Sequence, residues 1–115
     1  MTPFAVVDED WHDDVPVVRI DGEVDAANVG DVGSRLRAMM TNRSVVLVVD
    51  LSDTSYLDSA GINLLFAIGE ELRTRQQALR LVVPPGSAVA RMLTITSLDR
   101  AYQTYPSRAD ALAAS

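Results

Sequence analysis

The sequence contains no cysteine and no lysine, and each absence removes whole classes of function. Without cysteine there are no disulfides, no thiolate metal sites and no cysteine nucleophile. Without lysine there is no Walker-type phosphate lysine, no Schiff base and no lysine general base. The ten basic residues are all arginines, and His12 is the one histidine. The chemistry open to this chain therefore depends on carboxylates, hydroxyls, arginines and the backbone.

Long apolar runs are also missing. The longest have the length of a strand, which is too short to cross a bilayer, and the N-terminus lacks the basic region and apolar core of a secretory signal. We therefore expect a cytoplasmic protein with no membrane insertion. The net charge of −6 argues against nucleic acid as a direct ligand and fits a protein partner better. With 115 residues, 48% of them hydrophobic, the chain is expected to form one domain over residues 1–115.

Five segments have the pattern of β-strands. Phe4 to Asp8 is predicted to be a short strand, the acidic segment 9–14 a turn, and Val15 to Asp21 a second strand that forms a hairpin with the first. Segment 44–49 is apolar at consecutive positions, which indicates cover on both faces or a parallel neighbour. The remaining two strands are predicted at residues 79–83 and 101–105.

About four segments have the pattern of helices. After a loop over residues 22–27, Asn28 is predicted to cap the first helix, with Asp31 completing a box-like start. The second helix spans residues 59–75, and two shorter ones begin at Ser87 and Ser107. Alternating strands and helices imply an α/β fold with right-handed crossovers. We therefore predict a mixed sheet of four to five strands with an N-terminal hairpin and about four helices.

The segment from Val45 to Leu65 joins an apolar strand, a polar loop and a helix start. The loop brings Asp58-Ser59-Ala60-Gly61 to the first turn of the helix, where unpaired backbone N–H groups and the positive end of the helix dipole lie. Such a position tolerates an added phosphate well. From spacing alone, the simpler interpretation is favoured, that Asp58 or Ser59 caps the helix.

The stretch Asp58-Ser59-Ala60-Gly61 after an apolar strand resembles the signature of STAS-domain anti-sigma factor antagonists, also called anti-anti-sigma factors. Two further stretches resemble the family in order and spacing, one from Arg19 to Asp25 and one from Pro84 to Leu93. Together the three stretches span nearly the whole chain. The resemblance implies a STAS fold and a bacterial partner-switching protein that is not itself an enzyme and needs no cofactor.

In the family that the chain resembles, the serine directly after the aspartate is phosphorylated, which makes Ser59 the expected phosphorylation site. The implied partner is an anti-sigma factor serine kinase, which binds the unphosphorylated chain and releases the phosphorylated one, while a serine phosphatase resets the switch. Ala60 stands where family members often have serine or threonine, so a second hydroxyl is absent. The residues expected at the partner surface are Asp25, Asp58, Ser59, Ala60 and Gly61. Asp25 also fits the simpler role of a turn former.

Several alternatives remain open from the residues. Some STAS domains are accessory subunits that dock on a transport ATPase in lipid trafficking, and the motif does not exclude them. A serine hydrolase would need His12, which lies among carboxylates far from Ser59, and a Gly-x-Ser-x-Gly elbow is absent. A phosphorylated receiver aspartate at Asp50, with residues 8–10 holding magnesium, would need a late lysine. Segment 85–87 could receive an anion, but a Gly-rich phosphate loop is lacking, so nucleotide is not expected. The spacing of the acidic residues in segment 8–14 matches no EF-hand, so no metal is expected either.

Overall fold

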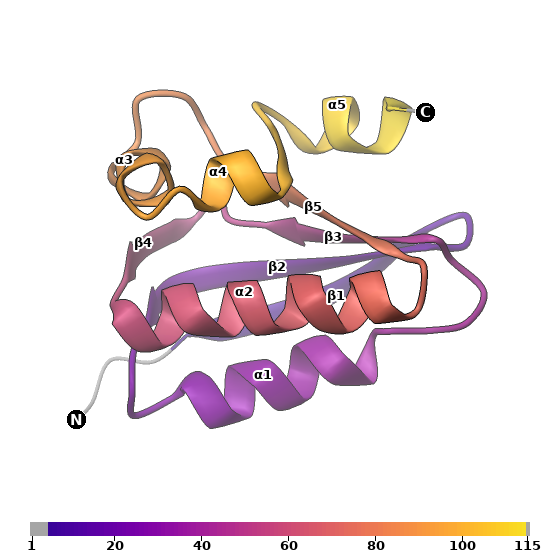
Figure 1. Cartoon of the computed structure of the whole chain (residues 1–115), viewed down its shortest axis with the longest axis horizontal. Coiled ribbons are helices and arrows are strands. Elements are labelled where there is room, and N and C mark those ends of the chain that lie inside the picture. Colours follow the sequence, from indigo (N-terminus) through magenta and orange to yellow (C-terminus); the bar gives the residue numbers. More distant parts are fainter. Residues whose placement is uncertain (1–4, 115) are drawn as a thin grey trace.

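The structure is a computed structural model, and it describes residues 5–114 of the chain. Six strands and five helices follow one another along these residues (Figure 1). The strands are β1 (Val6–His12), β2 (Val15–Val24), β3 (Val46–Asp50), β4 (Thr54–Leu57), β5 (Ala78–Val82) and β6 (Gln103–Tyr105). The helices are α1 (Val29–Ala38), α2 (Ser59–Thr74), α3 (Ala88–Ile95), α4 (Leu98–Ala101) and α5 (Arg108–Ala113).

The strands form a mixed sheet in the order β1-β2-β3-β5-β6, with β4 paired to β2 outside this path. β1 and β2 are antiparallel, and the other pairs are parallel. Gly22, with a φ of 112°, lies at a bulge where β2 leaves its pairing with β3 and continues beside β4. Because β4 leads directly into α2, the carboxyl end of β2 lies next to the start of that helix.

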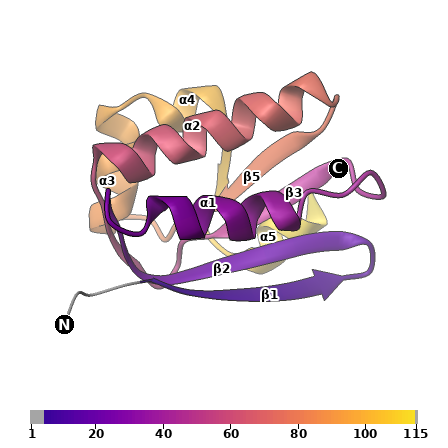
Figure 2. The same cartoon turned by 90° about the horizontal axis from the view of Figure 1, so that it is seen from below.

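The helices cover the two faces of the sheet unequally. α1 and α2 lie side by side on one face, and α5 lies on the other (Figures 1 and 2). The larger core lies under α1 and α2 and takes in apolar side chains of α3 and α4. The smaller core joins Ala111 of α5 to four valines of the sheet, Val17, Val46, Val48 and Val82.

The central strand β3 is buried at every position. Leu47 and Val49 belong to the larger core, whereas Val46 and Val48 belong to the smaller one, as the alternation of side chains along a strand requires. Its two neighbours, β2 and β5, are both parallel to it. The prediction of cover on both faces or a parallel neighbour is therefore confirmed, since β3 has both.

The N-terminal hairpin forms as predicted, but the predicted turn over residues 9–14 is wrong. β1 continues to His12, and the turn consists of Asp13 and Asp14, with Asp13 at a φ of 55°. Phe4, the predicted start of the strand, lies outside the described residues. The acidic residues of segment 9–12 fit a strand because β1 is an exposed edge strand, where charged side chains meet water instead of a core.

The predicted counts of strands and helices are close to the observed ones but omit β4 and α4. The exposed Ser55 and Tyr56 give β4 no alternating pattern, and its backbone pairs with residues 22–24, which were predicted to be a loop. α4 is a single turn held by the fully buried Leu98. Both elements depend on contacts with distant segments. In the described part of the chain, no helix is long and apolar enough to cross a membrane.

Candidate functional site

The first turn of α2 separates the roles of Asp58 and Ser59. Asp58 is the N-cap, and its Oδ1 accepts a hydrogen bond from the Gly61 amide at 3.1 Å. Ser59 is the first helical residue, and its side chain is exposed. Among the described residues, its hydroxyl makes no hydrogen bond. Of the two residues that spacing allowed as the cap, the aspartate takes this role, which leaves the serine hydroxyl accessible at the positive end of a helix of 16 residues.

Asp58 also contacts the segment between β2 and α1. Its Oδ2 accepts a hydrogen bond from the Ala26 amide at 3.1 Å, and its own amide donates to the Val24 carbonyl at 3.1 Å. The carboxylate thus bridges two segments that are 32 residues apart in sequence. The half-buried Asp58 is therefore a structural centre of the site as well as a neighbour of Ser59.

Asp25 forms the turn that precedes α1. Its Oδ1 accepts hydrogen bonds from the amides of Ala27 and Asn28 at 2.9 and 3.2 Å. Asn28 occupies the predicted N-cap position of α1, but its side chain makes no capping hydrogen bond, contrary to the predicted box-like start. Its buried amide group instead accepts from the Asp25 amide at 2.9 Å and donates to the Glu23 carbonyl at 2.8 Å. The structure thus places Asp25 in the role of a turn former, and in residues 5–114 its Oδ2 accepts no hydrogen bond.

Gly61 is buried, unlike the exposed Ser59 two residues earlier. A Cβ atom at this position would lie 3.1 Å from the Val24 carbonyl oxygen and 3.2 Å from Leu57 Cδ2. The glycine therefore lets the first turn of α2 approach the end of β2. Ala60 is half-buried beside it. The five expected residues thus lie on two adjoining segments, but Gly61 packs inward.

An apolar groove of about 470 Å³ runs from Ser59 along α2 toward α3. Its lining residues are Tyr56, Leu57, Asp58, Ser59, Ile62, Asn63, Phe66, Met92 and Thr96. Tyr56 is 47% exposed, and Ile95, at the end of α3, is 76% exposed. The sequence prediction missed this groove because it joins β4, α2 and α3. In the sequence, the one sign of this groove is Tyr56, an aromatic residue just before Asp58.

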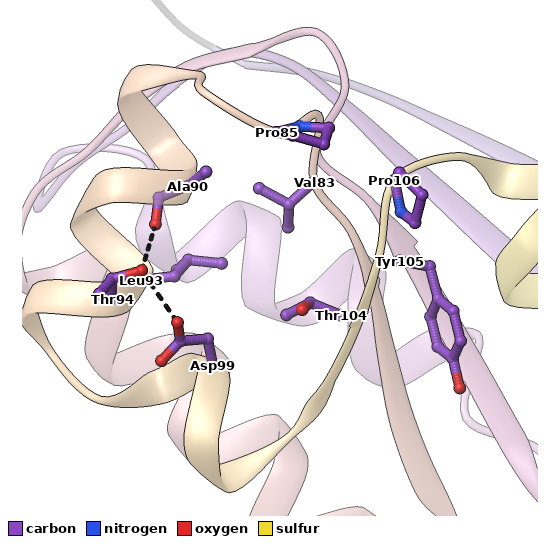
Figure 3. Close-up of a pocket in the computed structure, with 9 residues that line it drawn as sticks. All are labelled: Val83, Pro85, Ala90, Leu93, Thr94, Asp99, Thr104, Tyr105 and Pro106. Carbon is purple, nitrogen blue, oxygen red and sulfur yellow. Dashed lines mark hydrogen bonds between the residues drawn. The ribbon is translucent and has the colours of Figure 1, made fainter.

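A second hollow, of about 290 Å³, lies beside the start of α3 (Figure 3). It includes the Asp99 carboxylate, to which the Thr94 hydroxyl donates at 2.9 Å. At the nearby helix start, the Ser87 hydroxyl accepts from the Ala90 amide at 3.0 Å. A carboxylate in the hollow and a cap that already uses this N–H group both disfavour the anion site considered for segment 85–87.

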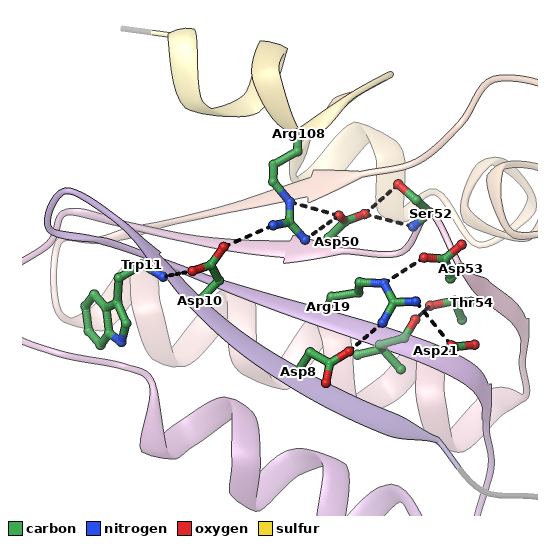
Figure 4. Close-up of polar contacts among 11 residues, drawn as sticks. Asp8, Asp10, Trp11, Arg19, Asp21, Asp50, Ser52, Asp53, Thr54 and Arg108 are labelled. Carbon is green, nitrogen blue, oxygen red and sulfur yellow. Dashed lines mark hydrogen bonds and ion pairs between the residues drawn. The ribbon is translucent and has the colours of Figure 1, made fainter.

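Asp50, at the end of β3, is held by Arg108 and Ser52 (Figure 4). Arg108 Nη2 donates to Asp50 Oδ2 at 2.9 Å, and the Ser52 amide donates to Oδ1 at 2.9 Å. Burial, which leaves Asp50 only 5% exposed, by itself raises the pKa of its carboxyl. The hydrogen bonds from Ser52 and Arg108 outweigh burial and hold the pKa below its ordinary value. Such a carboxylate is occupied in structural contacts rather than open to phosphoryl transfer.

The acidic residues of segment 8–10 pair with arginines. Asp8 pairs with Arg19, Glu9 with Arg35 and Asp10 with Arg108. Arg19 also binds Asp21 and Asp53, at 3.1 and 2.7 Å (Figure 4). The described residues contain no group of three side chains placed to hold a metal ion. These contacts disfavour the receiver interpretation of Asp50.

His12 and Ser59 lie at opposite ends of β2. His12 pairs with Val15 at the start of the strand, whereas Asp58 binds Val24 at its end. Ten residues at about 3.3 Å each separate them by about 30 Å. A catalytic histidine must lie within hydrogen-bond reach of its serine, so this geometry argues against a serine hydrolase.

The chain is similar to known proteins both in sequence and in overall fold. The family model of the STAS domain matches residues 7–111. Anti-sigma-F factor antagonist RsfB of Mycobacterium tuberculosis is 28% identical over 102 residues, which are 88% of this chain and 81% of RsfB. The crystal structure of an anti-sigma factor antagonist from Mycobacterium paratuberculosis is similar with a TM-score of 0.81 and 29% identity, covering 96% of this chain and 92% of that one.

The unphosphorylated form of the anti-sigma factor antagonist SpoIIAA is a more distant neighbour. Its TM-score is 0.75 at 16% identity, and the likeness covers 93% of each chain. At this identity, the comparison concerns the fold alone.

Proposed function

The chain belongs to the STAS domain family, and on this premise we propose that it is a bacterial anti-anti-sigma factor that works by partner switching. Unphosphorylated, it binds an anti-sigma factor serine kinase and so frees a sigma factor. Phosphorylated on Ser59, it releases that kinase, and a serine phosphatase restores the hydroxyl. The chain is then a substrate and a binding module, not an enzyme, and its proposed partners place it in the cytoplasm.

The accessible hydroxyl of Ser59 is the observation that carries the proposal. The hydroxyl lies at a helix start whose cap is supplied by another residue, so modification breaks no internal hydrogen bond. In the proposed step, the Ser59 oxygen forms a bond to the γ-phosphorus of ATP, the bond to the β-phosphate oxygen breaks, and ADP leaves. The kinase accepts the hydroxyl proton. The names of the relatives, RsfB and the Mycobacterium paratuberculosis protein, support this class of partner.

The groove beside Ser59 supports a partner surface at the same place. Tyr56, Phe66 and Met92 contribute apolar surface next to the serine. Partially exposed aromatic and methionine side chains are enriched where proteins bind one another. In the proposal, apolar side chains of the anti-sigma factor occupy this groove and Ser59 lies at the edge of the contact.

Charge explains how a phosphate on Ser59 removes the partner. A phosphate adds about −1.5 to −2 charges, which the N-terminus of α2 accepts without refolding. One like-charge pair at about 4 Å costs about 4 kcal/mol at an effective dielectric constant of about 20. A loss of about hundredfold in affinity needs only about 2.8 kcal/mol. Amide chemical shifts are therefore expected to change around Asp25 and residues 58–62 and to stay unchanged in β3 and β5.

The proposal is tested with the anti-sigma factor kinases encoded in the source genome. Each is titrated with wild-type chain, with chain phosphorylated by that kinase and ATP, and with Ser59→Ala. We expect tight binding of the wild type and Ser59→Ala and weak binding of the phosphorylated form. If folded Ser59→Ala does not bind a kinase that binds the wild type, the hydroxyl itself is a contact and the switch is wrong. Recovery of a transport ATPase in place of a kinase from a cell lysate would favour the accessory-subunit alternative.

A further inference from the structure

Asp58 uses both carboxylate oxygens to join two segments of the site. Oδ1 holds the Gly61 amide of α2, and Oδ2 holds the Ala26 amide of the turn before α1, each at 3.1 Å. The Asp58 amide adds a hydrogen bond to the Val24 carbonyl. Capping the helix requires only the first of these contacts. The contact with Ala26 therefore calls for a separate explanation.

The turn over residues 25–28 is ordered by its own side chains. Asp25 accepts from two amides within the turn, and Asn28 holds the Asp25 amide and the Glu23 carbonyl. None of these bonds reaches α2. Among the side-chain hydrogen bonds of the described residues, the one between Asp58 Oδ2 and the Ala26 amide connects this turn to the start of α2. Without this hydrogen bond the turn would keep its shape but would no longer be held by the residue that precedes Ser59.

We propose that Asp58 is a positioning residue that holds the turn over residues 25–28 against the start of α2, so that Asp25 and Ser59 are presented to the kinase as one surface. The inference rests on the proposed function. Asp25 Oδ2, which accepts no hydrogen bond in the described part of the chain, is the group that the turn offers to the partner. Asp58 itself acts through these neighbours, because both of its oxygens are engaged within the chain.

The test separates capping from positioning with Asp58→Ser. Serine is as good an N-cap as aspartate, but its shorter side chain offers one oxygen and cannot also reach Ala26. Asp58→Asn is the second variant, because it keeps one oxygen for the cap and turns a donor toward the Ala26 donor. Ser107→Ala, which removes the cap of α5 on the opposite face of the sheet, is the matched control.

Two measurements are made on each variant: amide exchange with solvent by NMR, and the kinetics of phosphorylation by the kinase with ATP. In Asp58→Ser, the Ala26 amide is expected to exchange about tenfold faster while Gly61 exchanges as in the wild type. The KM of the kinase for the chain is expected to rise about tenfold with kcat nearly unchanged. Asp58→Asn is expected to change both readouts in the same direction, and Ser107→Ala to change neither.

The outcomes distinguish this inference from the proposed function. Unchanged Ala26 exchange in both Asp58 variants overturns the inference, because the hydrogen bond then does not hold the turn. Faster exchange of the Ala26 amide with unchanged KM also overturns the inference, because the hydrogen bond then holds the turn without affecting recognition by the kinase. If the kinases neither bind nor phosphorylate the wild type, the proposed function is wrong and the positioning role falls with it. Circular dichroism identifies a variant that does not fold, and the other Asp58 variant then decides.

Discussion

The starts of α2 and α5 contain similar residues in different arrangements. At α5, Ser107 is the N-cap, and its hydroxyl accepts from the Asp110 amide at 3.1 Å. At α2, Asp58 is the N-cap, and Ser59 follows as an exposed helical residue. The start of α3 resembles that of α5, because Ser87 caps it through its hydroxyl. At these three helix starts, a shift of one position therefore decides whether the serine caps the helix or offers its hydroxyl to solvent.

The surroundings of the two helix starts differ as well. Arg108, the first residue of α5, binds the buried carboxylate of Asp50 and fastens the helix to the sheet (Figure 4). The start of α2 instead opens on an apolar groove. A helix start with a serine thus stabilises the fold at α5 and, in our proposal, binds the partner at α2.

The largest expected effect is the loss of phosphate uptake in Ser59→Ala. Incubated with the kinase and ATP, wild-type chain is expected to gain one phosphate by intact mass, and Ser59→Ala none, because Ser59 is exposed in the first turn of the 16-residue α2, whereas the exposed Ser97 precedes only the four-residue α4. Ser107→Ala, the equivalent change at α5, is expected to gain phosphate like the wild type. Equal phosphate uptake by wild type and Ser59→Ala would show that Ser59 is not the phosphorylation site.

The second prediction concerns charge at the two helix starts. Ser59→Glu is expected to bind the anti-sigma factor about a hundredfold more weakly than wild type, a difference of about 2.8 kcal/mol in binding free energy. Ser107→Glu carries the same charge on the opposite face of the sheet and should bind normally. Isothermal titration calorimetry measures both. A similar loss in the two variants would indicate a long-range effect of net charge in place of a local one.

The third prediction tests the fastening of α5. Arg108→Leu is expected to lower the free energy of unfolding by about 2 kcal/mol, because it leaves the Asp50 carboxylate buried without its charged partner. Arg91→Leu, an exposed arginine on α3, is the control and should change stability by less than about 0.5 kcal/mol. Urea denaturation measures both, and kinase binding by Arg108→Leu should remain normal.

The same pair makes stability depend on pH in a definite direction. The pKa of Asp50 is lowered from 3.8 in the folded state, so its ionised form stabilises the fold above that value. This contribution is lost as pH falls through the lower folded pKa. The difference in unfolding free energy between wild type and Arg108→Leu should therefore be constant near neutral pH and shrink in acid, as the Asp50 carboxyl becomes protonated in the folded wild type. A constant difference down to low pH would show that the Asp50 charge is not its source.

The smallest expected effect distinguishes the serines as caps. Ser87→Ala and Ser107→Ala should each lower the unfolding free energy by about 1 kcal/mol, since each loses a helix cap. Ser59→Ala should change it by less than about 0.5 kcal/mol, because Asp58 keeps the cap of α2. Thermal or urea unfolding of the three variants compares them directly. A loss of about 1 kcal/mol in Ser59→Ala would mean that its hydroxyl is not free after all.

Much of the fold was predictable because its signals are local. The hairpin, the apolar run of β3, and the helices that start at residues 59, 88 and 108 follow from periodicity and cap residues. One omission lies where a distant segment decides, because β4 exists through its pairing with the end of β2. The other error is local, because the Asn28 side chain holds Glu23 and Asp25 instead of capping α1. The spacing of Asn28 and Asp31 could not reveal this, because it does not show that the Asn28 side chain binds backbone groups of the preceding turn.

By itself, the sequence determined that Ser59 follows an aspartate at the start of an amphipathic helix, that cysteine and lysine chemistry is absent, and that the chain resembles the STAS family. These properties depend on residue identity and on spacing along the chain. Only the tertiary structure decided which residue caps α2, which amide the second oxygen of Asp58 holds, and that Arg108 closes over Asp50, which is 58 residues away. The reason is physical: a polar group binds whichever partner the packing of the sheet and helices brings within about 3 Å, and sequence separation does not enter.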